Sequence, residues 1–182
     1  MKTIEKSRLA WAITGSGHYL RECLEIADGL EDVDLFLSRA GMEVLQQYGY
    51  KHNMARIFQD KTASAVPVEM FYYGHYHTVV IAPATSNTIA KMVCGISDTL
   101  VTNVYAQAGK CSVPSIVFAC DTAPEVESEA PRDNMVTVYP RRIDLDNIQK
   151  LATFEETTVV SDMQQLQAAI QARLACLKTS SS

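Results

Sequence analysis

Residues 9–17 read LAWAITGSG, an apolar run that ends in a glycine-serine-glycine turn. Apolar runs without alternation are typical of strands that are buried on both faces of a parallel sheet. A helical pattern follows, with Leu20 and Leu24 on its apolar face, and it ends near Gly29. A buried strand, a tight turn and an amphipathic helix in this order predict the first unit of an α/β sheet.

The same alternation continues along the chain. Further patterns of buried strands occupy residues 33–37, 78–82, 115–119 and 157–160. Helical patterns follow Ser38, the segment 83–88, and Ser161, which would form a capping box with Gln164. Segment 51–76 is ambiguous apart from a helix start at Pro67, and the acidic segment 121–134 reads as an exposed excursion before a short strand or hairpin at 136–139.

Strands that alternate with helices predict an α/β fold with a doubly wound parallel sheet, Rossmann-like or flavodoxin-like, in three α/β/α layers. Residues 1–178 are expected to form a single domain, followed by a disordered tail at 179–182.

Composition excludes several classes of function. The chain has 182 residues and a net charge of −5, without a long run of Lys or Arg, which argues against a nucleic-acid partner. No apolar stretch is long enough to cross a membrane, and the polar N-terminus does not resemble a signal peptide, so the cytoplasm is the expected compartment. Its 5 cysteines are widely spaced without a C-x-x-C pair, which argues against a disulfide framework, an iron–sulfur cluster or a cysteine-rich zinc site.

Small and hydroxyl-bearing residues follow three of the predicted strands, at 15–18, Ser38 and 83–88. In doubly wound sheets, ligands bind beyond the carboxyl ends of the strands, where such loops meet. We therefore expect these three loops to form one site.

The Gly15-Ser16-Gly17 turn can direct backbone N–H groups at an anion, with help from the dipole of the following helix. It lacks the lysine of a nucleotide-hydrolase loop and the third glycine of a dinucleotide fingerprint, so a monophosphate such as FMN fits better than ATP or NAD. The alternative is a turn whose glycines only need positive φ. Ser38 is expected to cap a helix, which does not exclude phosphate binding.

The run Thr85-Ser86-Asn87-Thr88 offers more short hydrogen-bonding side chains than one helix cap needs. It can hold the polar edge of an isoalloxazine ring, and the alternative is a capped turn. His75 and His77 lack a third ligand at suitable spacing, so no metal site is predicted. Arg141 and Arg142 next to Asp144 are expected to form a surface ion pair.

The stretches PATSNT at 83–88 and GISDTL at 95–100 resemble motifs of the homo-oligomeric flavin-containing cysteine decarboxylase (HFCD) superfamily. The resemblance implies that Gly15, Ser16, Gly17 and Ser38 hold the FMN phosphate. It also implies that Thr85, Ser86, Asn87 and Thr88 face the flavin, and that the protein forms a homotrimer or a larger assembly of trimers.

Two departures from that superfamily bear on the reaction. Glu69-Met70 occupies the region of the decarboxylases' catalytic histidine, and Cys120-Asp121-Thr122-Ala123-Pro124 stands where they carry a substrate clamp. Cys120 also replaces a flavin-contacting arginine of the related prenyltransferases. The departures disfavour decarboxylation and prenyl transfer.

Over its whole length the chain is closer to the archaeoflavoproteins and dihydromethanopterin reductases, through residues 11–17, 37–41 and 142–147. This resemblance implies an oxidoreductase in which FMN passes electrons from NAD(P)H or another reduced carrier to a dihydropterin. A non-enzymatic electron carrier and a decarboxylase remain as alternatives. No catalytic residue is identified, and His75, Tyr73 or solvent are the candidate proton sources.

Overall fold

The computed structural model of the chain describes residues 7–54, 56–61, 66–130 and 134–180. Its elements are β1 (Arg8–Ile13), α1 (Leu20–Asp28), β2 (Val33–Leu37), α2 (Arg39–Tyr48), β3 (Arg56–Gln59), the 3₁₀ helix η1 (Val66–Phe71), β4 (Tyr76–Ala84), α3 (Ser86–Val93), α4 (Leu100–Lys110), β5 (Ser115–Ala119), β6 (Val126–Ala130), β7 (Asn134–Val138), α5 (Arg142–Leu151), β8 (Thr157–Val160) and α6 (Met163–Ser180). Strand β3 was not predicted from the sequence. It lies at the edge of the sheet with mostly exposed side chains, and it therefore lacks an apolar run.

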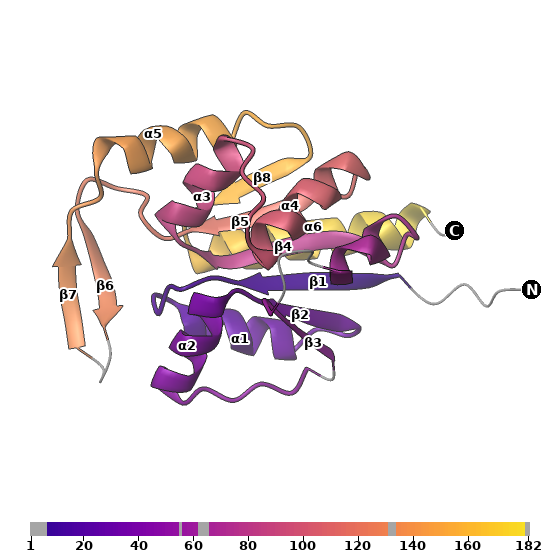
Figure 1. Cartoon of the computed structure of the whole chain (residues 1–182), viewed down its shortest axis with the longest axis horizontal. Coiled ribbons are helices and arrows are strands. Elements are labelled where there is room, and N and C mark those ends of the chain that lie inside the picture. The colour runs from indigo at the N-terminus through magenta and orange to yellow at the C-terminus, as the bar shows by residue number, and fades with distance from the viewer. Residues whose placement is uncertain (1–6, 55, 62–65, 131–133, 181–182) are drawn as a thin grey trace, which may run out of the picture.

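The central sheet has 6 strands in the order β3-β2-β1-β4-β5-β8, and every neighbouring pair is parallel. The chain first builds outward from β1 to β3 and then returns to build on the other side from β4 (Figure 1). This is the strand order of the Rossmann fold, and the direction of winding reverses between β1 and β4. The predicted doubly wound fold is confirmed, and in such folds ligands bind at the carboxyl ends of the strands next to the reversal.

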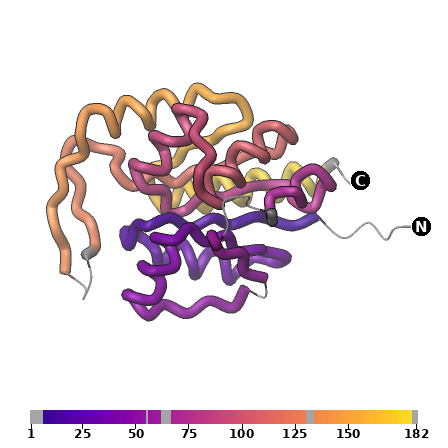
Figure 2. Tube along the Cα trace, in the orientation of Figure 1, coloured from indigo at the N-terminus to yellow at the C-terminus, as the bar shows by residue number. Residues whose placement is uncertain are grey.

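Helices cover both faces of the sheet, as the chain trace also shows (Figure 2). Residues Leu9, Trp11 and Ile13 of β1 face α1, α2 and α6, whereas Ala10 and Ala12 face η1, α3, α4 and α5. Because both faces of β1 are fully covered, its run needs no polar alternation. The small alanines also let the second helical layer approach the strand closely.

A buried ion-pair network closes the amino end of the sheet. The carboxylate of Asp34 is fully buried and accepts from Nε of Arg8 at 2.8 Å and from the hydroxyl of Tyr76 at 2.8 Å. Burial is the main cause of the raised pKa of Tyr76, which therefore stays a neutral donor. This end of β1, β2 and β4 is filled by its own side chains, so a ligand site is expected at the opposite end.

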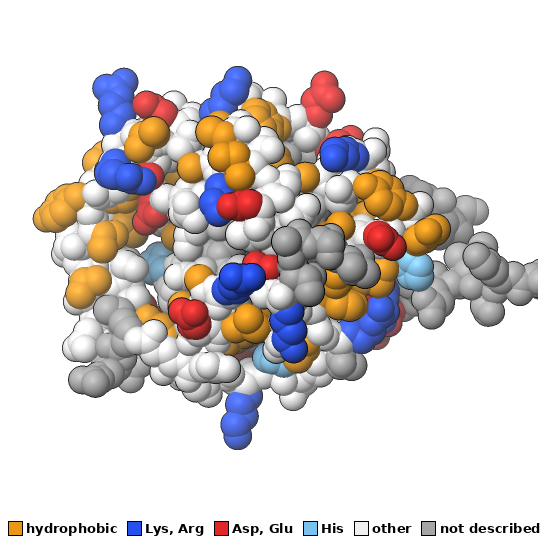
Figure 3. All heavy atoms as spheres, viewed as in Figure 1, with side chains coloured by type: hydrophobic (Ala, Val, Ile, Leu, Met, Phe, Trp, Pro, Cys, Tyr) orange, Lys and Arg blue, Asp and Glu red, His pale blue; other side chains and the backbone are white. Residues whose placement is uncertain are grey.

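Strands β6 and β7 form an antiparallel hairpin beyond the carboxyl end of the sheet, at the left of Figure 1. The exposed excursion predicted for 121–134 thus includes a strand. The hairpin exposes large apolar side chains, with Met135 59% and Val136 41% accessible. In Figure 3, hydrophobic side chains gather along the same left-hand margin.

The C-terminal helix differs slightly from its predicted limits. Its cap is Asp162 rather than Ser161, because the carboxylate of Asp162 accepts from the backbone N–H of Gln165 at 2.8 Å. The helix also continues through Ser180, two residues into the segment expected to be a tail, and residues 181–182 lie outside the described part. Among the described helices, none combines the length and the apolar character that crossing a bilayer requires.

Candidate functional site

The loops that follow β1, β2 and β4 meet at the carboxyl edge of the sheet. The backbone N–H of Ser38 donates to the carbonyl of Ile13 at 3.2 Å, which joins the β1 and β2 ends. The hydroxyl of Thr14 donates to the carbonyl of Pro83 at 2.7 Å and accepts from the N–H of Thr85 at 2.9 Å, which joins the β1 and β4 ends. The predicted convergence of the three loops is confirmed.

The glycines of the first loop are required for space. Neither Gly15 nor Gly17 has a positive φ, so the alternative that the turn needs left-handed glycines is wrong. A Cβ on Gly15 would lie 2.6 Å from Cβ of Ala40 in the first turn of α2, and one on Gly17 would collide with the hydroxyl of Tyr48. The loop therefore lies directly against helix α2, with its backbone close to the helix N-terminus.

Ser38 caps helix α2 as predicted. Its hydroxyl oxygen accepts from the N–H of Gly41 at 2.9 Å, and a Cβ on Gly41 would lie 2.6 Å from the carbonyl oxygen of Ile13. The amides of residues 39 and 40 precede the first intrahelical bond, so the helix does not use them. These amides and the positive end of the helix dipole make this corner suited to an anion.

Ser16 belongs to the loop after β1 and contacts the loop after β5. Its hydroxyl oxygen accepts from the N–H of His18 at 3.2 Å and from the thiol of Cys120 at 3.3 Å. Because both acceptor positions are used, the proton of the Ser16 hydroxyl is left to donate to a ligand. Burial raises the pKa of Cys120 to about 12, so the thiol keeps the proton that it donates.

The run Thr85–Thr88 divides into structural and available groups. Thr85 caps α3, and its hydroxyl and that of Thr88 lie 3.1 Å apart, so both are engaged in the cap. Ser86 donates its hydroxyl proton to the carboxylate of Asp121. Asn87 is exposed, and no hydrogen bond joins its side chain to another described residue. Asn87, the hydroxyl oxygen of Ser86 and the first amides of α3 therefore remain available to a ligand, and the prediction that Thr85–Thr88 face a flavin stays a prediction.

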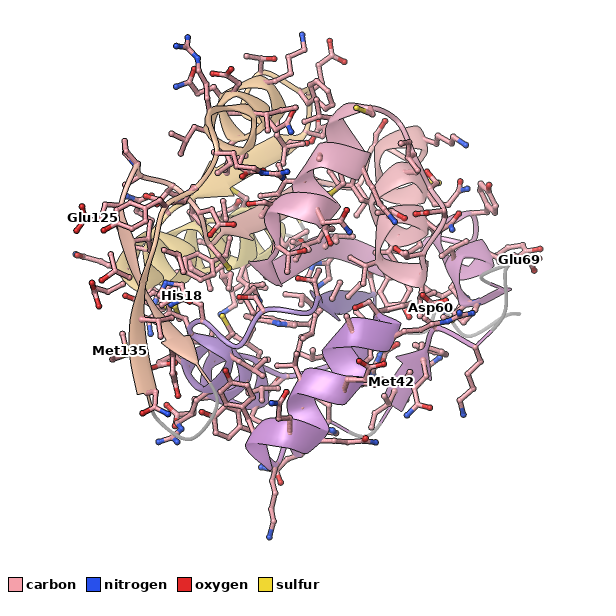
Figure 4. All side chains as sticks on the ribbon, turned by 60° about the vertical axis from the view of Figure 1, so that its left-hand side comes forward. His18, Met42, Asp60, Glu69, Glu125 and Met135 are labelled. Atoms are coloured by element: carbon pink, nitrogen blue, oxygen red, sulfur yellow. The ribbon has the colours of Figure 1, made fainter. Side chains whose placement is uncertain are left out.

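A buried histidine at the same edge was not predicted as a site residue. His18 is 8% exposed and follows the glycine-serine-glycine turn directly. Burial lowers its pKa, and the carboxylates of Asp121, Glu22 and Glu129 oppose that effect. Figure 4 shows His18 next to the β6–β7 hairpin. In the sequence, its position immediately after the turn was the available signal.

The hairpin is tied to this edge through two tyrosines. The hydroxyl of Tyr48 donates to the backbone carbonyl of Glu129 at 3.3 Å, and that of Tyr50 donates to its carboxylate at 3.2 Å. Glu129, in the segment expected to be an exposed excursion, thus connects β6 to the end of α2.

Other predicted residues lie elsewhere. His75 lies at the amino end of the sheet, where its carbonyl accepts from the N–H of Arg8, and Tyr73 precedes it in the same turn, so neither is near the loops that meet. Arg141 pairs with Asp144 at 2.8 Å and Arg142 with Asp146 at 3.6 Å, so the predicted ion pair forms, although the carboxylate of Asp144 is buried rather than on the surface. The described residues contain no group of His, Cys, Asp or Glu side chains placed to hold a metal ion.

A hollow of about 680 Å³ lies away from this edge, between α4 and the loop before β8. It is lined by residues such as Ile96, Tyr105 and Phe154. None of the residues predicted for the ligand site lines this hollow, so the convergent loops remain the candidate site.

Comparison with known proteins adds three findings. The family model described as Flavoprotein matches residues 1–181. A dihydromethanopterin reductase (acceptor) of Methanosarcina mazei is 34% identical over 141 residues, which are 68% of this chain and 59% of that protein. DmrB of Burkholderia xenovorans, solved in complex with FMN and described as a cubic protein cage for redox transfer, is 52% identical, with a TM-score of 0.88 over 97% of this chain and 99% of its own.

A phenylacrylic acid decarboxylase of Aquifex aeolicus shares the fold, with a TM-score of 0.62 at 23% identity over 86% of this chain and 81% of its own. At that identity, the similarity extends to the architecture and no further. It agrees with the doubly wound sheet described above.

Proposed function

This chain belongs to the Flavoprotein family, and on that basis we propose that it is an FMN-dependent oxidoreductase that reduces a dihydropterin. The observation that carries the proposal is the meeting of the β1, β2 and β4 loops at the carboxyl edge. The FMN complex of the 52% identical DmrB and the names of the reductase relatives support it.

The first loop and helix α2 fit a phosphate monoester. Ser16 and Ser38 each retain a hydroxyl proton for donation, and the amides of residues 39 and 40 are not used by the helix. Gly15 lies against Cβ of Ala40 and Gly41 against the carbonyl oxygen of Ile13, so neither position has room for a side chain beside these donors. Gly15, Ser16, Gly17 and Ser38 would hold the phosphate.

The β4 loop would hold the flavin ring. The side chain of Asn87 and the first amides of α3 are available for its polar edge, while Thr85 and Thr88 fix the start of the helix. When bound, FMN supplies the two-electron chemistry that converts a C=N bond into an amine. The protein binds and orients both partners and keeps water away, as its rigid strand ends and the adjoining hairpin allow.

The test begins with the purified protein, which should be yellow and release FMN rather than FAD on heating. The chemically reduced protein is then mixed anaerobically with a dihydropterin, and flavin reoxidation is followed by stopped-flow absorbance. Reoxidation faster than that of free reduced FMN is expected. A protein that binds no flavin would refute the proposal.

A second candidate function is electron transfer between proteins without a pterin substrate. The description of DmrB as a cage for redox transfer favours it. The same experiment separates the two functions, because a carrier would reduce a partner protein or dye but would not accelerate the reaction with dihydropterin.

We also propose that the chain assembles as a homotrimer or a multiple of three. The cage described for DmrB and the exposed apolar side chains of the β6–β7 hairpin support this assembly. The physiological donor would be NAD(P)H or another reduced carrier.

A further inference from the structure

We propose that His18 is the ionisable counter-charge for the phosphate of FMN, so that FMN binding takes up a proton at this imidazole. The inference rests on the proposed FMN binding and deepens it, since it names the group that distinguishes a phosphorylated flavin from riboflavin. It assigns a role to a buried titratable residue that the proposed reaction does not otherwise use.

His18 directly follows the Gly15–Gly17 turn, which is the loop proposed to hold the phosphate. Its backbone N–H donates to the hydroxyl of Ser16 at 3.2 Å, the same oxygen that receives the Cys120 thiol. The residue is 8% exposed, and its ring lies against the ring of Tyr19, with 4.1 Å between centroids. Tyr19 has a left-handed backbone with φ of 53°, which ends the loop and starts helix α1. The backbone of His18 is therefore tied to the loop, and its ring follows the loop directly and packs on Tyr19.

The charges around His18 come from three elements. Asp121 approaches from the loop after β5, Glu22 from α1 and Glu129 from β6. All three favour the protonated imidazole, but burial has the larger effect and lowers its pKa. At neutral pH, His18 of the free protein is consequently neutral, in surroundings where additional negative charge would favour protonation.

The loop has no permanent cation of its own. Residues 14–19 include neither Lys nor Arg, and Nε of Arg39, the first residue of α2, is turned toward the carbonyl of Asp60 at 3.4 Å. A phosphate monoester carries close to two negative charges above its second pKa of about 6. Its arrival beside His18 would raise the pKa of the imidazole, because an opposite charge stabilises the protonated form.

A linkage argument gives the sign of the effect. Between the pKa of His18 in the free protein and its higher pKa in the complex, each FMN bound takes up as much as one proton. The dissociation constant of FMN should then rise by up to tenfold for each pH unit in that interval. Riboflavin has no phosphate, so its dissociation constant should stay nearly constant over the same range.

The experiment measures quenching of FMN and riboflavin fluorescence by the flavin-free protein from pH 6.5 to 8.5. It compares the wild type with His18→Gln and with the control His75→Gln at the other end of the sheet. The wild type and the control should lose FMN affinity as the pH rises, whereas His18→Gln should bind FMN weakly and with a flat profile. An equal slope in His18→Gln and the wild type would overturn the inference.

A second measurement does not depend on the variant. The C–H signals of His18 in the wild type are titrated by NMR, without ligand and with saturating FMN. A higher pKa in the complex supports the inference, and an unchanged pKa overturns it. A wild type that binds neither flavin would instead refute the proposed function, so the two failures can be distinguished.

Discussion

The hydroxyl groups at the carboxyl edge of the sheet differ in whether they donate a hydrogen bond to another residue of the protein. Ser86 donates to Asp121, whereas the oxygen of Ser16 only accepts, from His18 and Cys120. The sequence indicates that hydroxyl residues gather here, but their availability also depends on Asp121 and Cys120, which lie more than thirty residues away in the chain and which local patterns do not contain.

Cys120 should be chemically inert in the folded protein. Its side chain is buried, and a pKa of about 12 leaves roughly one thiolate in ten thousand at pH 8. Iodoacetamide should modify the exposed Cys94 first, and Cys120 only after unfolding. Peptide mass spectrometry over a time course measures this order, and early modification of Cys120 would show that the thiol is accessible.

His18 should make the flavin-free protein sensitive to acid. Its folded-state pKa lies below the ordinary value of 6.5, so the unfolded chain binds more protons in the interval between the two values. Stability is therefore lost as the pH falls below about 6.5. Thermal unfolding at a series of pH values should show a smaller loss for His18→Gln than for the wild type. Parallel curves for the two proteins would contradict this account of the histidine.

At the scale of elements, the starts of the helices have both a structural and a binding role. Ser38 caps α2 at the site, while Thr99 caps α4 through a reciprocal capping box with Thr102. The two caps are chemically alike, but Ser38 lies at the convergence of the loops. Comparing the two caps therefore separates the contribution of capping to stability from the contribution of Ser38 to ligand binding.

Ser38→Ala and Thr99→Ala should each lower the free energy of unfolding by about 1 kcal/mol. Ser38→Ala alone should also weaken FMN binding, by roughly 10-fold to 100-fold, because it removes a hydrogen bond to a charged group. Denaturant melts and fluorescence titrations measure the two effects. Equal FMN affinity in both variants would remove Ser38 from the phosphate site.

The sequence predicted the buried strands better than it predicted the exposed ones. Continuous apolar runs identified β1, β4 and β5, since these strands are covered on both faces. Strands β3 and β6 carry no such run and were not predicted, whereas the short strand or hairpin expected at 136–139 corresponds to β7. His18 was missed for another reason: its burial results from the β5 loop and the hairpin, which are distant in sequence.

On the scale of the whole molecule, the two ends of the sheet differ in construction. The amino end is closed by the buried Asp34 network, and the carboxyl end is joined by hydrogen bonds between loops. The hairpin extends beyond that carboxyl end. Two-stranded hairpins are marginal by themselves, so contact with a neighbouring subunit would stabilise this one.

Met135→Glu should therefore reduce the size of the assembly measured by light scattering. Met135 is 59% exposed on β7, and a charge placed there would be costly if a second copy covered it. Ile57→Glu, at a 41% exposed apolar position on the edge strand β3, is the control and should leave the size unchanged. A wild-type protein that is already monomeric would contradict the proposed assembly.

Tyr48 contacts both the Gly15–Gly17 loop and the β6–β7 hairpin. Its hydroxyl fills the space beside Gly17 and donates to the carbonyl of Glu129, so one rigid ring spans the two regions. A shift of the loop by a fraction of an ångström would displace this ring and, through it, strand β6. If the proposed assembly places a subunit contact at that strand, cofactor binding to one protomer would also change the strength of its contacts with neighbouring subunits.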